Sequence, residues 1–136
     1  MEAQAMTTDT TRRWSITLYW INAALLLTHE IDSAYWHEWK LFGVPGDIEG
    51  FLLFNFVLIV IVLHGFRQLL LEAPSGRWYA VLLGGGGVFA FTVHLTFIAL
   101  GRPEFATLAS AALLVCTGVA SLAQIVLAVR LPAVRV

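Results

Sequence analysis

Long apolar runs alternate with short polar joints along the chain. Four such runs are present, at residues 14–35, 48–71, 78–100 and 105–131. A bilayer core requires about 20 predominantly apolar residues in a helix. None of the runs shows the alternation at every second position that is typical of a membrane barrel strand. The pattern therefore predicts an all-α fold, an integral membrane four-helix bundle with four transmembrane spans.

The joints between the runs are short and carry turn residues. Pro45, Pro74 and Pro103 each lie in one joint, close to glycines, and such residues end helices. Short connections make successive helices antiparallel neighbours, so residues 14–131 form one transmembrane domain. Residues 1–13 are polar and are expected to be a disordered tail.

Composition supports the membrane class and excludes others. The chain has 136 residues, of which 59% are hydrophobic and 12% are charged, whereas a soluble domain has about 25% charged residues. The formal net charge of −1 provides no basic field for phosphates, so nucleic acid is not an expected partner. The single cysteine, Cys116, permits no disulfide within the chain.

The basic residues predict the orientation. One side of the predicted bundle carries six of them and the other side carries Lys40 and Arg102; the six are Arg12, Arg13, Arg67, Arg77, Arg130 and Arg135. Basic residues are enriched on the cytoplasmic side of membrane proteins. We therefore expect both termini in the cytoplasm, and a multi-pass protein of the bacterial inner membrane.

Ionisable residues gather towards the outward side. Five of the nine acidic residues lie between Glu30 and Glu49, and such residues in a membrane are functional by default. At about 1.5 Å per residue, His29 in the first span and His94 in the third reach a similar depth. The sequence predicts one polar cluster there, composed of His29, Glu30, Asp32, Glu49, Asn55 and His94.

Two residues are expected to support this cluster from the helices that carry it. Asn22 shares a helix face with His29, seven residues on. Gly87 shares a face with His94 and closes a run of four glycines. Glycines in a membrane helix permit close helix approach or leave room for a ligand.

Further support is expected from the rim of the cluster. Trp36, His37 and Glu38 follow the first span and would lie at the outer edge. The alternative is an interfacial aromatic belt with solvated charges. His64, near the cytoplasmic side, is a separate feature.

The first function that fits the cluster is acid–base chemistry on a lipophilic, lipid- or isoprenoid-like substrate in the membrane. The catalytic candidates are His29, Glu30, Asp32, His94 and Glu49, because imidazole and carboxyl groups exchange protons near neutral pH. A divalent metal, Zn or Fe, would assist if bound by His29, Asp32 and His94.

Other functions remain open for the same residues. His29 and His94 on facing helices would hold a b-type haem, although the outward side offers few basic partners for its propionates. A chain of buried His and carboxyl groups also suits a small oligomeric transporter or proton conductor. The structural alternative is a satisfied polar network between helices.

The fourth span carries small residues at three- and four-residue spacing: Ala109, Ala112, Cys116, Ala120 and Ala123. Such a stripe is a helix-packing face. It predicts a homo-oligomer, with membrane lipids and a lipophilic small molecule as the other partners.

The segment from Thr28 to Asp32, Thr-His-Glu-Ile-Asp, with Trp39 and the Pro45 loop after it, resembles a family of small bacterial membrane proteins. Those proteins have four spans, the first of which closes on a Thr-His-Glu-(Leu/Ile)-Asp signature. The resemblance implies the fold but no activity. A fainter similarity in residue types, to emopamil-binding-protein-like sterol isomerases, implies proton donation to an alkene by one group and proton removal by another.

Overall fold

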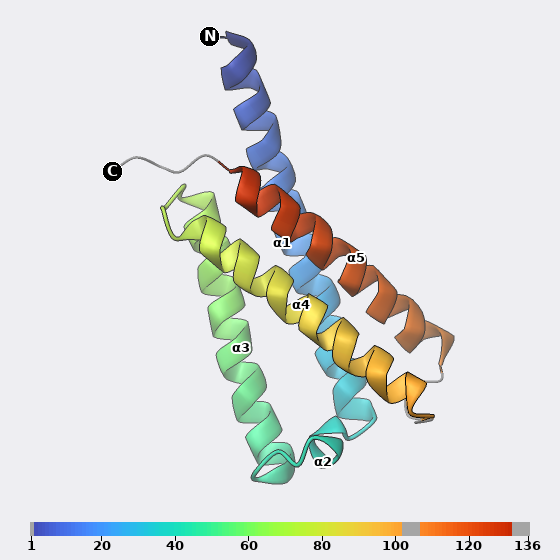
Figure 1. Ribbon diagram of the computed structural model, residues 1–136. Coiled ribbons are helices and arrows are strands. Elements are labelled where there is room, and N and C mark those ends of the chain that lie inside the picture. The colour runs from blue at the N-terminus through green and yellow to red at the C-terminus, as the bar shows by residue number, and fades with distance from the viewer. Residues whose placement is uncertain (1, 102–106, 132–136) are drawn as a thin grey trace.

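The computed structural model describes residues 2–101 and 107–131, with side chains from Asp9 onward. The described part is all-α, as the apolar runs predict (Figure 1). Its helices are α1 (Glu2–Tyr35), α2 (Glu38–Leu41), α3 (Asp47–Leu70), α4 (Gly76–Ala99) and α5 (Leu108–Arg130).

Three of the predicted spans are confirmed as helices that are long and apolar enough to cross a membrane. α3, α4 and α5 have mean hydropathies of 2.1, 1.8 and 2.3, and each has 23 or 24 residues. At 1.5 Å per residue such a helix is about 35 Å long, which exceeds the bilayer core of about 30 Å. The chain is therefore a multi-pass membrane protein. The predicted span at residues 14–35 lies within α1, whose polar residues keep it out of this group.

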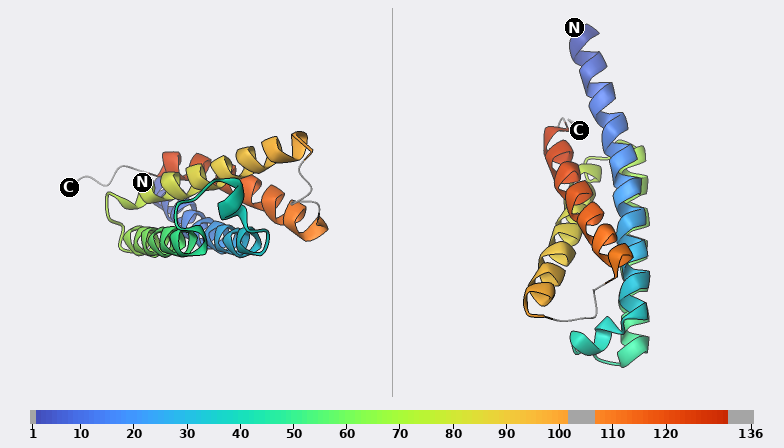
Figure 2. Two further views of the ribbon diagram at one scale, coloured as in Figure 1. Left: turned by 90° about the horizontal axis from the view of Figure 1, so that it is seen from below. Right: turned by 90° about the vertical axis from the view of Figure 1, so that its right-hand side faces the viewer.

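The N-terminal segment differs from the expectation of a disordered tail over residues 1–13. α1 begins at Glu2 and its first turns extend beyond the bundle (Figure 2). Two ion pairs stabilise the helix there: Arg13 with Asp9, at 2.9 Å, and Arg12 with Glu72 after α3, at 2.9 Å. Arg12 also donates to the Leu70 carbonyl at 3.2 Å, which joins α1 to the end of α3.

The two ends of the bundle differ in charge. The N-terminus, the end of α5 and the α3–α4 joint lie at one end, and α2 lies at the other (Figures 1 and 2). Arg12, Arg13, Arg67, Arg77 and Arg130 belong to the first end, and Lys40 to the second. Arg102 and Arg135 lie outside the described residues.

Glycines bring α4 against α5. A Cβ atom on Gly87 would collide with the Ser121 hydroxyl, and one on Gly84 would lie 2.9 Å from the Ser121 carbonyl oxygen. Gly85 and Gly86 have open space beside them. The glycine run therefore serves both uses expected of it: two glycines permit close approach, and Gly86 borders a cavity.

Asn22 has a different use from the one predicted. It is fully buried; it donates to Gln124 Oε1 at 2.9 Å and accepts from Ser121 Oγ at 3.1 Å. Gln124 in turn donates to the Ala80 carbonyl at 2.7 Å. Because this network joins α1, α5 and α4 and leaves both amides satisfied, Asn22 holds helices together and does not support the predicted site.

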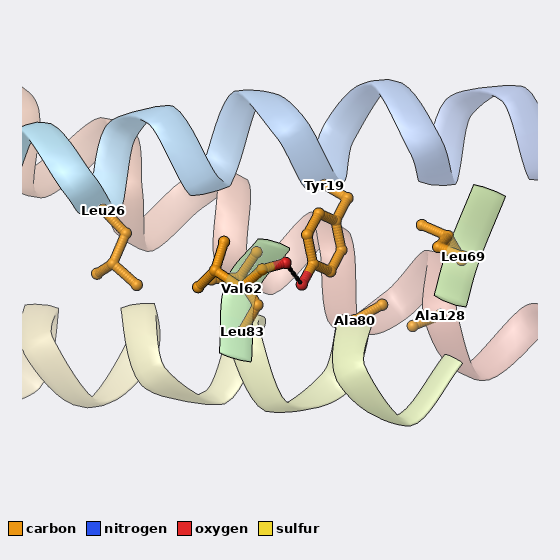
Figure 3. Packing of buried hydrophobic residues seen from close by; sticks show 7 residues of the cluster. All are labelled: Tyr19, Leu26, Val62, Leu69, Ala80, Leu83 and Ala128. Carbon is orange, nitrogen blue, oxygen red and sulfur yellow. Dashed lines mark hydrogen bonds between the residues drawn. The ribbon is translucent and has the colours of Figure 1, made fainter. Parts of the chain in front are cut away.

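The hydrophobic core lies towards the end of the bundle that carries the termini. It is formed by Tyr19, Leu26, Val62, Leu69, Ala80, Leu83 and Ala128 (Figure 3). The Tyr19 hydroxyl donates to the Val62 carbonyl at 2.9 Å. Only the second half of α3 contributes to this core, and towards α2 the helices α3 and α4 diverge (Figure 1).

The small-residue stripe of α5 faces mostly outward. Ala109, Ala112, Cys116 and Ala123 are exposed and Ala120 is buried. α5 uses another face, with Thr117, Gly118 and Ser121, for packing within the chain. The homo-oligomer remains a prediction.

Candidate functional site

A cavity of about 360 Å³ lies between α1, α2, α3 and α4. Most of its lining is apolar, and the aromatic part of it is Trp39, Phe42, Phe51, Phe54 and Phe89. The polar lining residues are His29, Glu30, Ser33, Glu38 and His94. This is the composition of a small-molecule site: mainly apolar, with a few polar groups at defined places.

The cavity reaches the outer surface between α3 and α4. Phe54 on α3 and Phe89 on α4 both line it, yet they are 58% and 71% exposed. Both helices are candidate membrane spans. The cavity thus borders the apolar exterior of the bundle.

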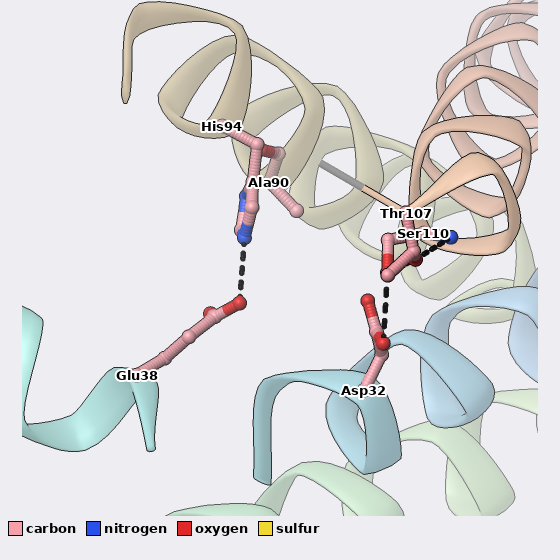
Figure 4. A network of polar contacts seen from close by, with 6 residues as sticks. All are labelled: Asp32, Glu38, Ala90, His94, Thr107 and Ser110. Atoms are coloured by element: carbon pink, nitrogen blue, oxygen red, sulfur yellow. Dashed lines mark hydrogen bonds and ion pairs between the residues drawn. The ribbon is translucent and has the colours of Figure 1, made fainter. Parts of the chain in front are cut away.

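A buried pair of ionisable groups forms one wall. Glu38 Oε1 lies 3.0 Å from His94 Nε2, and both side chains are at most 5% exposed (Figure 4). His94 Nδ1 lies 2.7 Å from the Ala90 carbonyl oxygen. Since a carbonyl only accepts, Nδ1 carries the hydrogen and Nε2 faces the carboxylate with its lone pair unless a further proton is present. The pair therefore requires one shared proton, or another cation, between Nε2 and Oε1.

The turn after α1 places Glu38 in this pair. α1 ends at Tyr35, and His37 adopts a left-handed backbone with φ of 56°. The chain thereby folds back, so that α2 buries Glu38 and Trp39. Trp39 packs on Phe51, with ring centroids 5.3 Å apart. Glu38 therefore lies in the cavity wall and not at the expected outer edge, and its burial also contradicts the alternative of a solvated charge. Both expectations continue the helix past His37, where the chain in fact reverses.

His29 completes the group. Its side chain is buried, and its ring meets the His94 ring edge-on with centroids 4.5 Å apart. One ligand atom from each of His29, Glu38 and His94 lies within 4.8 Å of the others. The two histidines thus lie together, as their similar predicted depth requires. Rings in edge contact leave no space between them for a porphyrin, so this geometry does not fit the haem alternative.

Glu30 lies on the α1 side of the cavity. It is half-buried and forms a hydrogen bond with the Asn55 side chain of α3. Asn55 also donates to the Phe51 carbonyl at 3.1 Å. The structure thus brings Glu30 and Asn55 together, as the predicted cluster requires.

Asp32 turns to the opposite side of α1. It accepts from Ser110 Oγ at 3.0 Å, and Ser110 is itself 2.6 Å from Thr107 Oγ1 (Figure 4). A separate cavity of about 10 Å³, with His29 and His94 also in its wall, adjoins Asp32; it has room for one water molecule. Glu38, not Asp32, is the carboxylate that lies with the two histidines.

Four other candidates lie outside the group. Glu49 is exposed in the first turn of α3, and His37 is exposed beside Trp39. Trp36 is half-buried and packs edge-on against Tyr35. His64 is exposed and lies 3.1 Å from the Gln68 amide nitrogen, away from the cavity, as a separate feature should.

The chain belongs to DUF6713, a family of unknown function, whose family model matches residues 15–131. Searches of curated proteins and of solved structures find no match. The family match brings no activity with it, so the function has to be argued from the site.

Proposed function

We propose that this DUF6713 member is a membrane-embedded enzyme that transfers protons on a lipophilic, lipid- or isoprenoid-like substrate. The observation that carries the proposal is the apolar cavity of about 360 Å³ with a buried, proton-sharing Glu38–His94 pair in its wall. A polar network that served only to join helices would need no cavity beside it.

The distribution of side chains on α1 supports a fourth span. Ser15, Asn22, His29 and Ser33 are buried, whereas the exposed residues include Trp14, Trp20, Ile31 and Tyr35. Polar residues inside and large apolar residues outside are what a lipid environment favours. The mean hydropathy of α1 is low because it includes the polar buried face, whereas the outer face is still largely apolar.

The charge difference between the ends supports a cytoplasmic position for both termini. The five described arginines at that end outnumber Lys40 at the other, in accordance with the positive-inside rule. The cavity then lies in the outward half of the membrane. A substrate enters it from the bilayer, between Phe54 and Phe89.

The lining favours a neutral ligand. Among the described residues, those around the cavity include aromatic and aliphatic side chains but no lysine or arginine. Phosphate and carboxylate head groups are usually bound by such cations. The reacting part of the substrate is therefore uncharged and largely hydrocarbon.

Glu30 is the proposed proton carrier. Its carboxyl group lines the cavity, and Asn55 holds it by a hydrogen bond. The Glu38–His94 pair also lines the cavity and holds its shared proton without net charge, as a proton donor. A base on one side and a proton donor on the other suit removal of one proton from the substrate and delivery of another.

Solvent deuterium tests the proposal even while the substrate is unidentified. The full chain in lipid nanodiscs is incubated in D2O with a bacterial total-lipid extract, and lipids are analysed by mass spectrometry. We expect deuterium in one lipid class, reduced about 10²- to 10⁴-fold in Glu30→Gln. The exposed acid Glu49 provides the matched control, since Glu49→Gln should leave the exchange unchanged.

Two results would overturn the proposal. One is the absence of protein-dependent deuterium in every lipid; the other is full exchange by a folded Glu30→Gln protein. Protein-dependent proton flux across vesicles without any exchange would instead favour a proton conductor.

A further inference from the structure

We propose that His29, Glu38 and His94 bind one first-row divalent transition-metal ion, such as Zn²⁺ or Fe²⁺. The inference deepens the proposed function, because the ion would replace the shared proton in the wall of the same cavity. Its binding is nevertheless tested without any activity.

The donor set matches this class of ion. Two imidazoles and one carboxylate are the protein ligands of many catalytic zinc sites and of non-haem iron(II) sites. In a tetrahedral site, ligand atoms at about 2.1 Å from the ion lie about 3.4 Å from one another. The three atoms already lie within 4.8 Å of one another, so side-chain movements that shorten a separation by at most about 1.4 Å close the site.

His94 is oriented as a ligand. Its Nδ1–H donates to the Ala90 carbonyl at 2.7 Å, so Nε2 points at Glu38 Oε1, 3.0 Å away. A hydrogen bond from the second ring nitrogen to a backbone carbonyl is typical of metal-binding histidines. Two acceptor atoms face each other here, and a divalent cation satisfies both where otherwise an extra proton must.

His29 provides an independent observation. Its side chain is 3% exposed, and no hydrogen bond joins its ring to another residue in the described part of the chain. A largely buried imidazole that makes no such hydrogen bond and lines a cavity is open to an ion or water bound there. The ring lies against His94, where an ion shared with Glu38 would satisfy one of its nitrogens.

The site leaves a coordination position for the substrate. Three protein ligands are the usual number in catalytic zinc sites, with the fourth position open. All three ligands line the large apolar cavity, so a molecule in the cavity can reach the ion. The ligand class implied is a lipophilic molecule with a carbonyl or hydroxyl oxygen that binds the metal.

Cobalt(II) and zinc are suitable probes. The full chain is purified in detergent, treated with a chelator, and titrated with Co²⁺ by visible absorption and with Zn²⁺ by competition. We expect one ion per chain. Loss of a residue that only orients a ligand weakens metal binding about 10- to 100-fold, so Glu38→Gln and His29→Gln should weaken it by at least about 100-fold.

The exposed residues provide matched controls. His64→Gln and Glu49→Gln remove the same chemical groups elsewhere and should bind Co²⁺ as the unsubstituted protein does. X-ray absorption on the zinc-loaded protein counts imidazole ligands directly, so the test does not depend on whether a variant folds. Two imidazoles are expected.

The inference is overturned if the folded protein binds neither ion, if folded Glu38→Gln binds both ions with unchanged affinity, or if the absorption data contain no imidazole. Deuterium exchange by a protein that binds no metal would remove the ion and leave the proposed function standing. Metal binding without deuterium exchange would confirm the metal site and remove the proposed function.

Discussion

The contact between α4 and α5 is the sharpest test of the packing, because two adjacent glycines in α4 have opposite surroundings. A Cβ on Gly84 would lie 2.7 Å from Ile125 Cγ1 and 2.9 Å from the Ser121 carbonyl oxygen, whereas a Cβ on Gly85 would have nothing within 4 Å. The carbonyl belongs to the backbone of α5 and cannot rotate away. Gly84→Ala must therefore move one helix, and Gly85→Ala need not.

The magnitudes follow from two opposing effects. Alanine favours a helix over glycine by about 1 kcal/mol, which both variants gain. Overpacking a well-filled contact costs about 1–3 kcal/mol, which only Gly84→Ala incurs. We expect Gly85→Ala to raise the free energy of unfolding by up to about 1 kcal/mol. Gly84→Ala should lie about 1–3 kcal/mol below Gly85→Ala.

Reversible unfolding in mixed micelles, followed by circular dichroism, measures both free energies. The comparison of neighbours removes the helix propensity, since both sites are in the middle of the same helix. Equal stabilities of the two variants would refute the close approach of α4 and α5 at Gly84. A Gly84→Ala protein more stable than the unsubstituted chain would refute it as well.

Two further predictions separate structure from chemistry. Gln124→Leu removes hydrogen bonds to Asn22 and to the Ala80 carbonyl. Each interhelical bond contributes about 0.6 kcal/mol, up to about 1.7, so the variant should lower the free energy of unfolding by about 1–3 kcal/mol and leave Co²⁺ binding unchanged. Loss of Co²⁺ binding by the folded variant would contradict the separation of the two sites. Gly86→Leu places a side chain beside the cavity, where a Cβ meets nothing within 4 Å. The variant should therefore reduce deuterium exchange without lowering the free energy of unfolding. Unchanged exchange would mean that the substrate does not occupy this cavity.

Hydropathy was sufficient to predict the three helices in which apolar residues predominate. α3, α4 and α5 match predicted runs to within a few residues, because nearly every position in them contributes to the average. α1 is harder, since its buried face carries Asn22 and His29. Its N-terminal part also meets the end of α3 through Arg12 and Glu72, a contact between distant parts of the chain that a local pattern does not contain.

The two histidines of the candidate site could be placed from the sequence because depth in a helical bundle is nearly linear in residue number. Glu38 could not, because its position depends on the left-handed backbone at His37. Neither glycine nor proline stands at residues 36 and 37 to indicate a reversal. The one available signal is the second His-Glu pair followed by Trp39, a large residue that a return of the chain would bury.

The polar residues of α1 separate into two kinds by whether they face α5 or the cavity. Asn22 is hydrogen-bonded to Gln124 and Ser121, and Asp32 to Ser110. All three partners belong to α5, so Asn22 and Asp32 serve to hold α1 against α5. His29 and Glu30 instead line the cavity, and no hydrogen bond from α5 reaches either of them in the described part of the chain. A membrane helix that needed polarity only for packing would place it against neighbouring helices and not beside a cavity. The two residues that it turns to the cavity are therefore the ones whose substitution should alter chemistry or metal binding more than stability.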